Sequence, residues 1–505
     1  MIAVVALAAV AIAQRQSDAS LPRGVVMAVG AVIAAAGLAT VASNDVVLSL
    51  LGDTTRMEGC ATAVLLSGAL VVGAAAGVAG WRTITHAFLA GAAVVTAVGL
   101  GQMVGVGAHT GRPTATLGNA AFLGAFLCLV IPVAIGRAAG DRAARRWAVP
   151  LVIASGVLLV GTESRGAWLG VLVGAGVALW PWVPGRRRLL LGAGFAVVAT
   201  LALAFAPTHG DAGSPDTARG RLDSWAISAR AIADRPVLGW GPDQMRVAFG
   251  RNLDEAFVRN YGLRQIPDRA HNRFLDVAAS GGVLGLGADV ALMVIAGIAI
   301  TRAARSIDDT AERICVTGIG AGLVAWLVQG QFLFDTFDLG VLAWLLAGSL
   351  LAAAPAARSI RVRDLAGWLV VPVAGVAWIG ALNVVADRQV QSASGRPPAV
   401  AAARLADAMR TRPRALDAYL LAAAVARSSH DPVLLGAVHE RLRDWRDDDV
   451  ALADAQVLEV LGTVTRDQSR LDEAGRTLRR LLALRPHDAR VLDALARVRR
   501  AKLSP

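Results

Sequence analysis

The chain has 505 residues, of which 55% are hydrophobic, and its mean hydropathy is +0.55. This apolar fraction exceeds the roughly 45–50% of soluble domains, which excludes an ordinary soluble enzyme and predicts a membrane protein. The net charge of +12 is carried by arginine, since Lys502 is the only lysine, and many arginines lie in short loops between apolar segments. Membrane topology accounts for arginines in such loops, so the charge does not indicate nucleic-acid binding.

Apolar segments long enough for helical membrane spans follow one another up to about residue 386. The first, residues 2–14, is short and has no basic region before it, so it is either a span, an uncleaved signal-like segment or the remnant of a mis-assigned start. The expected spans are 2–14, 24–43, 61–80, 84–106, 119–136, 147–162, 166–184, 189–206, 281–300, 314–334, 338–355 and 365–385. The sequence thus predicts an all-α polytopic membrane domain at 1–386 with about twelve transmembrane helices.

Arginine placement predicts the orientation of these spans. One alternating set of loops is rich in arginine, at positions 15, 23, 82, 137, 142, 145, 146, 186–188, 302, 305, 313, 358, 361 and 363. The short loops of the other set hold only Arg56, Arg112 and Arg165. The positive-inside rule makes the first set cytoplasmic, so the long loop 207–280 and everything after residue 386 should lie outside the cytoplasmic membrane.

The segment 398–505 differs from the spans, because its alanines and leucines recur at the spacing of amphipathic helices. Three similar stretches begin near Thr411, Trp445 and Leu484, with anchor residues at Pro413, Asp447 and Pro486 that are about 34 to 39 residues apart. This period resembles that of tetratricopeptide repeats, which would stack into an external superhelix. Such a module would either bind a partner, which is a protein or part of the substrate, or serve oligomerisation and stability. Asp447–Asp449, His430, His439 and His487 are expected to be solvated.

Four stretches between residues 45 and 350 are, in order, LLGDTTRMEGC, GRPTATLGNAAFLGAFL, ESRGAWLG, and RLDSWAISARAIADRPVLGWGPDQM with AHNRFLDVAASGGVLG. Together they resemble the superfamily of O-antigen ligases, polysaccharide polymerases and protein O-oligosaccharyltransferases. LLGDTTRMEGC around Arg56 is similar to an outer-loop stretch of the family. GRPTATLGNAAFLGAFL is similar to its Gly-Asn-Pro-Asn segment, although Ala120 and Ala121 replace Pro-Asn. ESRGAWLG resembles its Ser-Arg-Gly motif, with Arg165 as the arginine. RLDSWAISARAIADRPVLGWGPDQM followed by AHNRFLDVAASGGVLG resembles its large external loop and is the most specific signal.

Arginines are the expected ligands of the substrate, because the family transfers glycans from polyprenyl diphosphates and a diphosphate leaving group needs its charge stabilised. The sequence favours Arg56, Arg165 and Arg221 for this role, and the resemblance supports Arg165 and Arg221 most strongly. Arg219 and Arg269 are weaker alternatives in the same arginine-rich loop. A lone arginine at a membrane surface is otherwise more often a solvated or lipid-facing anchor.

His271 is the only histidine inside the recognised external motif. A neutral imidazole can accept a proton near neutral pH, and the resemblance implies that His271 activates the acceptor hydroxyl. Without the motif, a histidine bonded to backbone at a helix start would be the simpler interpretation. Asn272 is a further candidate beside it, and the role of Asp289, an ionisable group inside the ninth span, stays open. Because no Asp-x-Asp pair ends a span, a metal-independent reaction without cofactors is expected.

The sequence therefore predicts a multi-pass enzyme of the cytoplasmic membrane, an inverting glycosyltransferase of surface-polysaccharide biosynthesis. Its partners would be a polyprenyl-diphosphate-linked glycan donor, membrane lipids and a glycan, lipid, wall or protein hydroxyl as acceptor. Polymerisation, ligation and protein O-glycosylation share this mechanism, and the sequence does not separate them. The alternative class is a non-enzymatic glycan transporter or export scaffold. A transporter is expected to have charged or broken positions in the middle of its spans, whereas the span interiors carry almost no charge apart from Asp289.

Overall fold

The computed structural model describes residues 19–53, 58–106, 111–179, 218–261, 269–412, 416–445 and 447–503. The expected spans 2–14 and 189–206 lie outside these residues, and so does Arg56. In the membrane domain the helices are α2 (Arg23–Val41), α3 (Val46–Leu51), α4 (Cys60–Ala75), α5 (Gly77–Met103), α6 (Ala120–Gly140), α7 (Arg142–Gly161), α8 (Arg165–Leu179), α10 (Ala218–Asp234), α11 (Met245–Asn252), α12 (Glu255–Tyr261), α13 (Arg273–Arg305), α14 (Thr310–Gln329), α15 (Phe337–Leu351) and α16 (Val362–Ala393).

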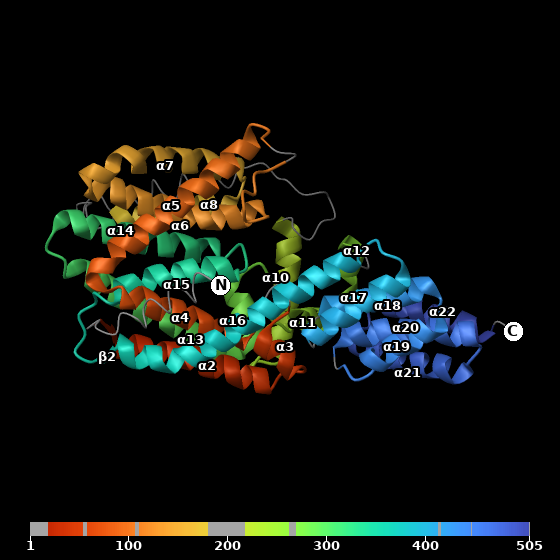
Figure 1. Ribbon diagram of the computed structural model, residues 1–505. Coiled ribbons are helices and arrows are strands. Elements are labelled where there is room, and N and C mark those ends of the chain that lie inside the picture. The colour runs from red at the N-terminus through yellow and green to blue at the C-terminus, as the bar shows by residue number, and fades with distance from the viewer. Residues whose placement is uncertain are drawn as a thin grey trace.

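The protein is an all-α polytopic membrane protein, and the other ten expected spans each coincide with a helix (Figure 1). Among the described residues, α2, most of α5, α6, α7, α13 and α14 are long and apolar enough to cross a membrane, while α4, α8 and α15 are apolar but shorter. The ninth expected span, 281–300, coincides with the part of α13 that follows a kink at Gly282, and a shorter helical segment from Arg273 precedes this kink. Helical backbone suits this environment because it satisfies its own polar groups.

Close contact between glycines brings α6 and α14 together at the centre of the helical bundle. A Cβ on Gly136 would lie 2.9 Å from the Cα of Gly318, and a Cβ on Gly318 would lie 2.8 Å from the Cα of Gly136. Small residues at such positions let apolar helices approach closely, so that dispersion contacts replace lipid contacts. Around this contact, fully buried side chains such as Leu123, Leu127 and Ile319 form the main core.

The predicted loop sets separate at the two ends of the bundle. At one end, strand β1 (Ser20–Pro22) pairs antiparallel with strand β2 (Ser359–Arg361), and Trp81 donates to Glu312 at 3.0 Å. These segments all belong to the arginine-rich set. The other end carries the loops before α6, α8, α13 and α15 and the α10–α12 segment; we call it the site end. Arginine-rich and arginine-poor loops thus lie apart, as the sequence predicts.

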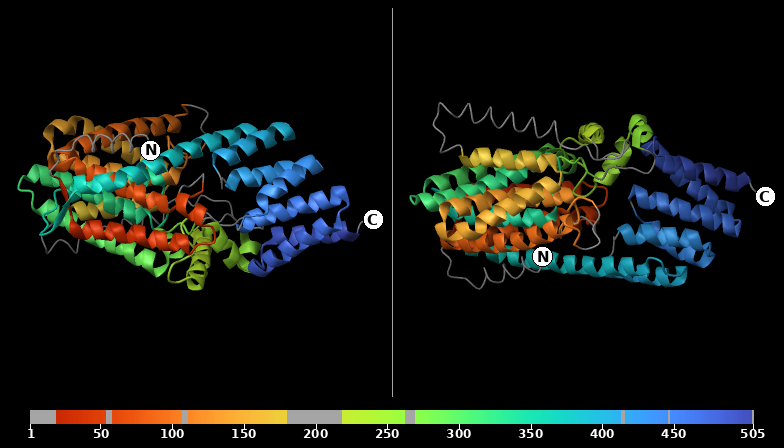
Figure 2. Two further views of the ribbon diagram at one scale, coloured as in Figure 1. Left: turned by 60° about the horizontal axis from the view of Figure 1, so that its bottom comes forward. Right: turned by 90° about the horizontal axis from the view of Figure 1, so that it is seen from above.

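Beyond the site end, helices α17 (Pro398–Thr411), α18 (Leu416–Ser429), α19 (Pro432–Leu442), α20 (Asp448–Thr465), α21 (Gln468–Leu484) and α22 (Ala489–Leu503) pack against one another in chain order (Figure 2). The long helix α16 connects them to the bundle. Buried leucines at helical spacing, including Leu471, Leu478 and Leu481 of α21, face the neighbouring helices. These six C-terminal helices are stabilised mainly by this apolar stripe.

Two expectations for the C-terminal helices are wrong. Asp447, Asp448 and Asp449 are not a solvated turn, since they are only 4–5% exposed. Asp447 caps α20 by accepting from the backbone amides of Asp449 and Val450, and the other two carboxylates bind arginines. His439 is also buried, with its Nδ1 2.7 Å from a carboxylate oxygen of Asp454 on α20. His430, by contrast, is exposed at the turn between α18 and α19.

Candidate functional site

The two halves of the strongest sequence motif form one joint at the kink of α13. Gly282 has a φ of +63° and a ψ of −161°, a conformation that only glycine adopts readily. A Cβ there would lie 2.2 Å from the carbonyl oxygen of Val237. The kink is closed by four backbone hydrogen bonds, from Val283 to Pro236, from Leu284 to Val237, from Trp240 to Ala279 and from Gly241 to Ser280. The Arg-Pro-x-x-Gly-Trp-Gly turn therefore satisfies the backbone groups that the kink frees.

His271 is held at the start of α13. Its backbone is left-handed, with a φ of +53°, and its ring meets the ring of Phe334 edge-on at a centroid distance of 5.4 Å. Asn272 is the N-cap of α13: its side chain accepts from the amide of Leu275 at 3.1 Å and donates to the carbonyl of Gln331 at 3.2 Å. The segment before α15, which contains Gln331 and Phe334, thus holds the half-buried His271 in place.

Arg273, whose side chain is 11% exposed, is a residue that sequence reasoning missed. Its guanidinium forms ion pairs with Asp289, at 2.7 Å, and with Asp335, and it lies 5.5 Å from the ring centroid of Trp326. Asp289, whose role the sequence left open, is therefore neutralised by Arg273 inside the bundle. Arg273 directly follows His-Asn, and that position was the only sequence signal pointing to it; its partners lie 16 and more residues away, beyond any local pattern.

Arg269 links three segments near His271. Its side chain is 5% exposed and contacts Glu58 at 2.7 Å and Asp243 at 2.8 Å. Asp243 also accepts from the amide of Asp53 at 2.5 Å, so the residues on both sides of Arg56 are joined to this cluster. Burial lowers the pKa of Arg269, but the two carboxylates outweigh it, and the pKa lies above its ordinary value. Because its charge is compensated, Arg269 is better suited to hold segments together than to bind a diphosphate.

Arg221 lies on the side of α10 that faces the segment before His271. Trp225, one turn further along, donates from its indole nitrogen to the carbonyl of Ala270 at 2.9 Å. Residues four apart lie on the same face of a helix, so the half-buried Arg221 shares this face. Arg219 is exposed at the beginning of the helix. The geometry thus brings Arg221, rather than Arg219, toward His271.

The second and third motifs reach the same region through the segment 329–336. Phe122, in the first turn of α6, meets Phe334 edge-on at 5.3 Å, and Phe334 in turn contacts His271. Ser164 accepts a hydrogen bond from Gln329 at 3.3 Å. Arg165 follows Ser164 as the first residue of α8 and is half-buried. All four motifs therefore converge on the site end, around a segment that the sequence analysis did not single out.

Left-handed backbone at residues other than glycine occurs in the second and third motifs and in both halves of the fourth. Ala115, Glu163, Asp243 and His271 have φ values of +47°, +52°, +58° and +53°. Each lies in a different motif segment. Such conformations persist only where surrounding contacts hold them, and they concentrate at functional sites. These backbone conformations therefore support a functional site at the site end.

A cavity of about 1060 Å³ extends from the site end between α4, α8, α13, α14 and α15. Arg273 and Asp289 line it near the site end, Arg305 and Arg313 line the other end, and the residues between are almost all apolar. The helix from Asp289 to Arg305 alone rises about 24 Å, most of a hydrocarbon core of roughly 30 Å. Among the described residues, Nε of Arg273 and one oxygen of Asp289 are buried without a hydrogen-bond partner. The cavity is long and is apolar along most of its length, but it is lined by charged side chains at the site end. This arrangement suits a lipid with a charged head.

Residues 150–288 match the family model described as O-antigen ligase. The match covers α7, α8, α10–α12 and the first half of α13, and so it includes Arg165, Arg221, His271 and the kink. No curated protein matches the chain. The match supports the superfamily of O-antigen ligases and polysaccharide polymerases for this chain, and with it a membrane glycosyltransferase of the O-antigen ligase type.

Proposed function

We propose that the protein transfers or polymerises a polyprenyl-diphosphate-linked glycan onto an acceptor hydroxyl at the outer face of the cytoplasmic membrane. One observation carries this proposal: the four motif segments converge around His271, and Arg273, two residues further along, lines the site end of a long apolar cavity. A cavity of this length accommodates a polyprenyl tail, and the site end places the diphosphate among arginines. The arginine distribution of the loops supports an external site end.

In the proposed reaction, the acceptor oxygen attacks the anomeric carbon of the donor sugar. The bond from that carbon to the diphosphate oxygen breaks, and His271 accepts the proton of the acceptor hydroxyl. Arg165 and Arg221, with Arg56 from the adjoining loop, stabilise the charge that grows on the departing polyprenyl diphosphate. One direct displacement inverts the anomeric carbon. The step needs no metal in this proposal, because guanidinium groups supply the positive charge.

Asn272 and Arg269 have positioning roles in this scheme. Asn272 uses both ends of its amide, as the N-cap of α13 and as a donor to Gln331, so it orients the residue before it. Arg269 holds the flanks of Arg56 and the segment of His271 together. The C-terminal helices are proposed to be helical repeats similar to tetratricopeptide repeats, with units that begin at α18, α20 and α22.

The direct test is transfer by purified protein in nanodiscs from an undecaprenyl-diphosphate oligosaccharide, with and without EDTA. Mass spectrometry of the product identifies the acceptor as glycan, lipid or peptide hydroxyl, which separates polymerase, ligase and protein glycosylation. Arg165→Ala should lower the rate by about 100-fold, whereas Arg82→Ala at the other end of the bundle should leave it within twofold. Absence of transfer with several donors, or equal rates for both variants, contradicts the proposal.

A further inference from the structure

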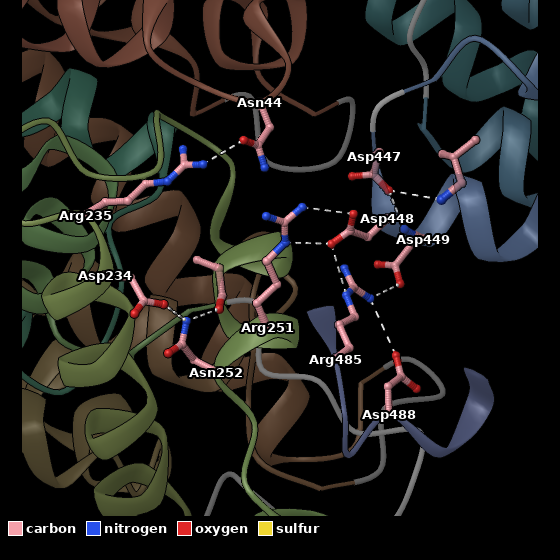
Figure 3. Close-up of polar contacts among 12 residues, drawn as sticks. Asn44, Asp234, Arg235, Arg251, Asn252, Asp447, Asp448, Asp449, Arg485 and Asp488 are labelled. Carbon is pink, nitrogen blue, oxygen red and sulfur yellow. Dashed lines mark hydrogen bonds and ion pairs between the residues drawn. The ribbon is translucent and has the colours of Figure 1, made fainter. Parts of the chain in front are cut away.

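The C-terminal helices are joined to the site end by buried ion pairs (Figure 3). Arg251, on α11, binds both carboxylate oxygens of Asp448 at the start of α20, with distances of 2.9 Å from Nε and 3.1 Å from Nη2. Arg246, also on α11, contacts Asp449 at 3.1 Å. The Arg251 and Asp448 side chains are 21% and 6% exposed, so the bidentate pair is largely removed from water.

Arg485, which follows α21, binds the same aspartates from within the C-terminal helices. Its side chain is 1% exposed and binds Asp448 at 3.3 Å and Asp449 at 2.9 Å. Burial lowers the pKa of Arg485, but the neighbouring aspartates raise it more, so the group stays charged. A Cβ on Gly250 would lie 2.8 Å from the guanidinium carbon, which shows that the backbone of α11 packs directly on Arg485. The junction is therefore close-packed rather than a loose surface contact.

Trp240 continues this contact toward the kink of α13. The guanidinium groups of Arg251 and Arg235 lie 5.6 and 4.2 Å from its ring centroid. The backbone amide of Trp240 donates to the carbonyl of Ala279 at 2.9 Å, inside the kink. His271 lies two residues before the start of the same short helical segment. A continuous series of contacts thus runs from Asp448 through Arg251 and Trp240 to the element that carries His271.

A second contact reaches the loop that contains Arg56. Arg412, at the end of α17, is 3% exposed and donates to the carbonyl of Gly52 at 2.9 Å. The next residue, Asp53, donates its amide to Asp243, which pairs with Arg269. These two contacts therefore end on segments that are joined to the segment of His271, one through the kink of α13 and the other through Asp243 and Arg269.

From this geometry we propose that the C-terminal helices are part of the catalytic apparatus, with Arg251 and Asp448 as positioning residues that hold the Trp240 joint and, through it, His271. This inference rests on the proposed function. Neither residue needs to touch substrate, because a small displacement of a proton acceptor is enough to slow transfer. Loss of the pair should lower kcat and leave the donor KM nearly unchanged, since the cavity itself is not altered.

Arg251→Gln is the informative variant, because Asp448 keeps its partner Arg485 and the C-terminal helices stay folded. We expect kcat to fall about tenfold, with the donor KM within twofold. Arg251→Lys should recover part of the loss, since it restores the charge without the bidentate geometry. The matched control is Arg497→Gln, which breaks an ion pair of 2.8 Å with Glu459 inside the C-terminal helices and touches nothing on α11. Its kcat should stay within twofold of wild type.

Hydrogen exchange of the peptide 236–244 gives a second readout that does not depend on activity. Its Trp240 and Gly241 amides should exchange about tenfold faster in Arg251→Gln than in wild type or Arg497→Gln. If wild type shows no transfer, the proposed function fails. Hydrogen exchange then still reports whether the Arg251–Asp448 pair holds the Trp240 segment in place. The inference is overturned if Arg251→Gln exchanges like wild type, or if it and Arg497→Gln lower kcat equally.

Discussion

The site end and the C-terminal helices both bury arginine–carboxylate pairs, but on different kinds of backbone. Arg269 joins Glu58 and Asp243 from distant segments, next to residues with left-handed backbone. Arg485 joins Asp448 and Asp449 at the start of a regular helix whose neighbours bury a leucine stripe. The site end thus uses polar contacts to hold an irregular geometry, whereas the C-terminal helices obtain their stability from apolar packing. Substitutions at the site end should act on transfer, and those in the leucine stripe of the C-terminal helices, away from the Arg251–Asp448 pair, on folding.

The largest effect should come from Leu478→Ala in the C-terminal core. Leu478 is fully buried on α21, so its truncation should lower the free energy of unfolding of these helices by about 2–5 kcal/mol. Denaturant unfolding of the full chain in nanodiscs, followed by circular dichroism, measures this loss. At a temperature where the variant remains folded, its kcat should stay near wild type. A large loss of kcat without loss of stability would contradict the division between the two regions.

Gly282→Ala tests the kink of α13. An alanine there cannot adopt the backbone conformation of Gly282 and would press against Val237. Transfer should fall about 100-fold, because the segment that carries His271 must shift. Gly287→Ala, on the same helix with open space around its Cβ, is the matched control and should keep the wild-type rate. Comparable rates for the two variants would show that the kink does not position the site.

Arg269→Gln distinguishes positioning from substrate binding. A positioning role predicts a fall of about tenfold in kcat with the donor KM nearly unchanged, because Glu58 and Asp243 lose the group that joins them. Steady-state kinetics over a range of donor concentrations separates the two constants. A raised KM with unchanged kcat would instead make Arg269 a diphosphate ligand.

The smallest effect concerns pH and the C-terminal helices. The hydrogen bond with Asp454 raises the pKa of His439 above 6.5, against the lowering effect of burial. When folding raises the pKa of a group, protonation of that group stabilises the folded protein at a pH below the pKa in the unfolded state. This stabilisation is lost as the pH rises through the pKa in the folded state. The C-terminal helices of wild type should therefore lose stability from pH 6 to pH 8, and His439→Gln should flatten this dependence. Thermal unfolding at the two pH values checks it; parallel curves would assign the pH dependence to other groups.

Much of the fold was predictable from sequence, because apolar length and arginine placement act locally. The expected spans in the described residues coincide with helices, and the two loop sets lie at opposite ends. The motifs also located His271 and the Gly-Trp-Gly turn. Arg273 and the burial of Asp447–Asp449 were not predictable, since their partners are supplied by distant segments: Asp335 for Arg273, and Arg246 and Arg251 for the aspartates. Long-range ion pairs leave no periodic signal in a single sequence.

The most direct test of the central claim separates donor binding from transfer at His271. Wild type, His271→Ala and His430→Ala are compared in nanodiscs for binding of a fluorescent undecaprenyl-diphosphate oligosaccharide and for its transfer. His430 is the matched control, since it shares the left-handed backbone but is exposed among the C-terminal helices. The account predicts equal binding by all three proteins and a loss of transfer of 100-fold or more, about the contribution of a general base, in His271→Ala alone. Wild-type transfer by His271→Ala, or a parallel loss of binding, would contradict it.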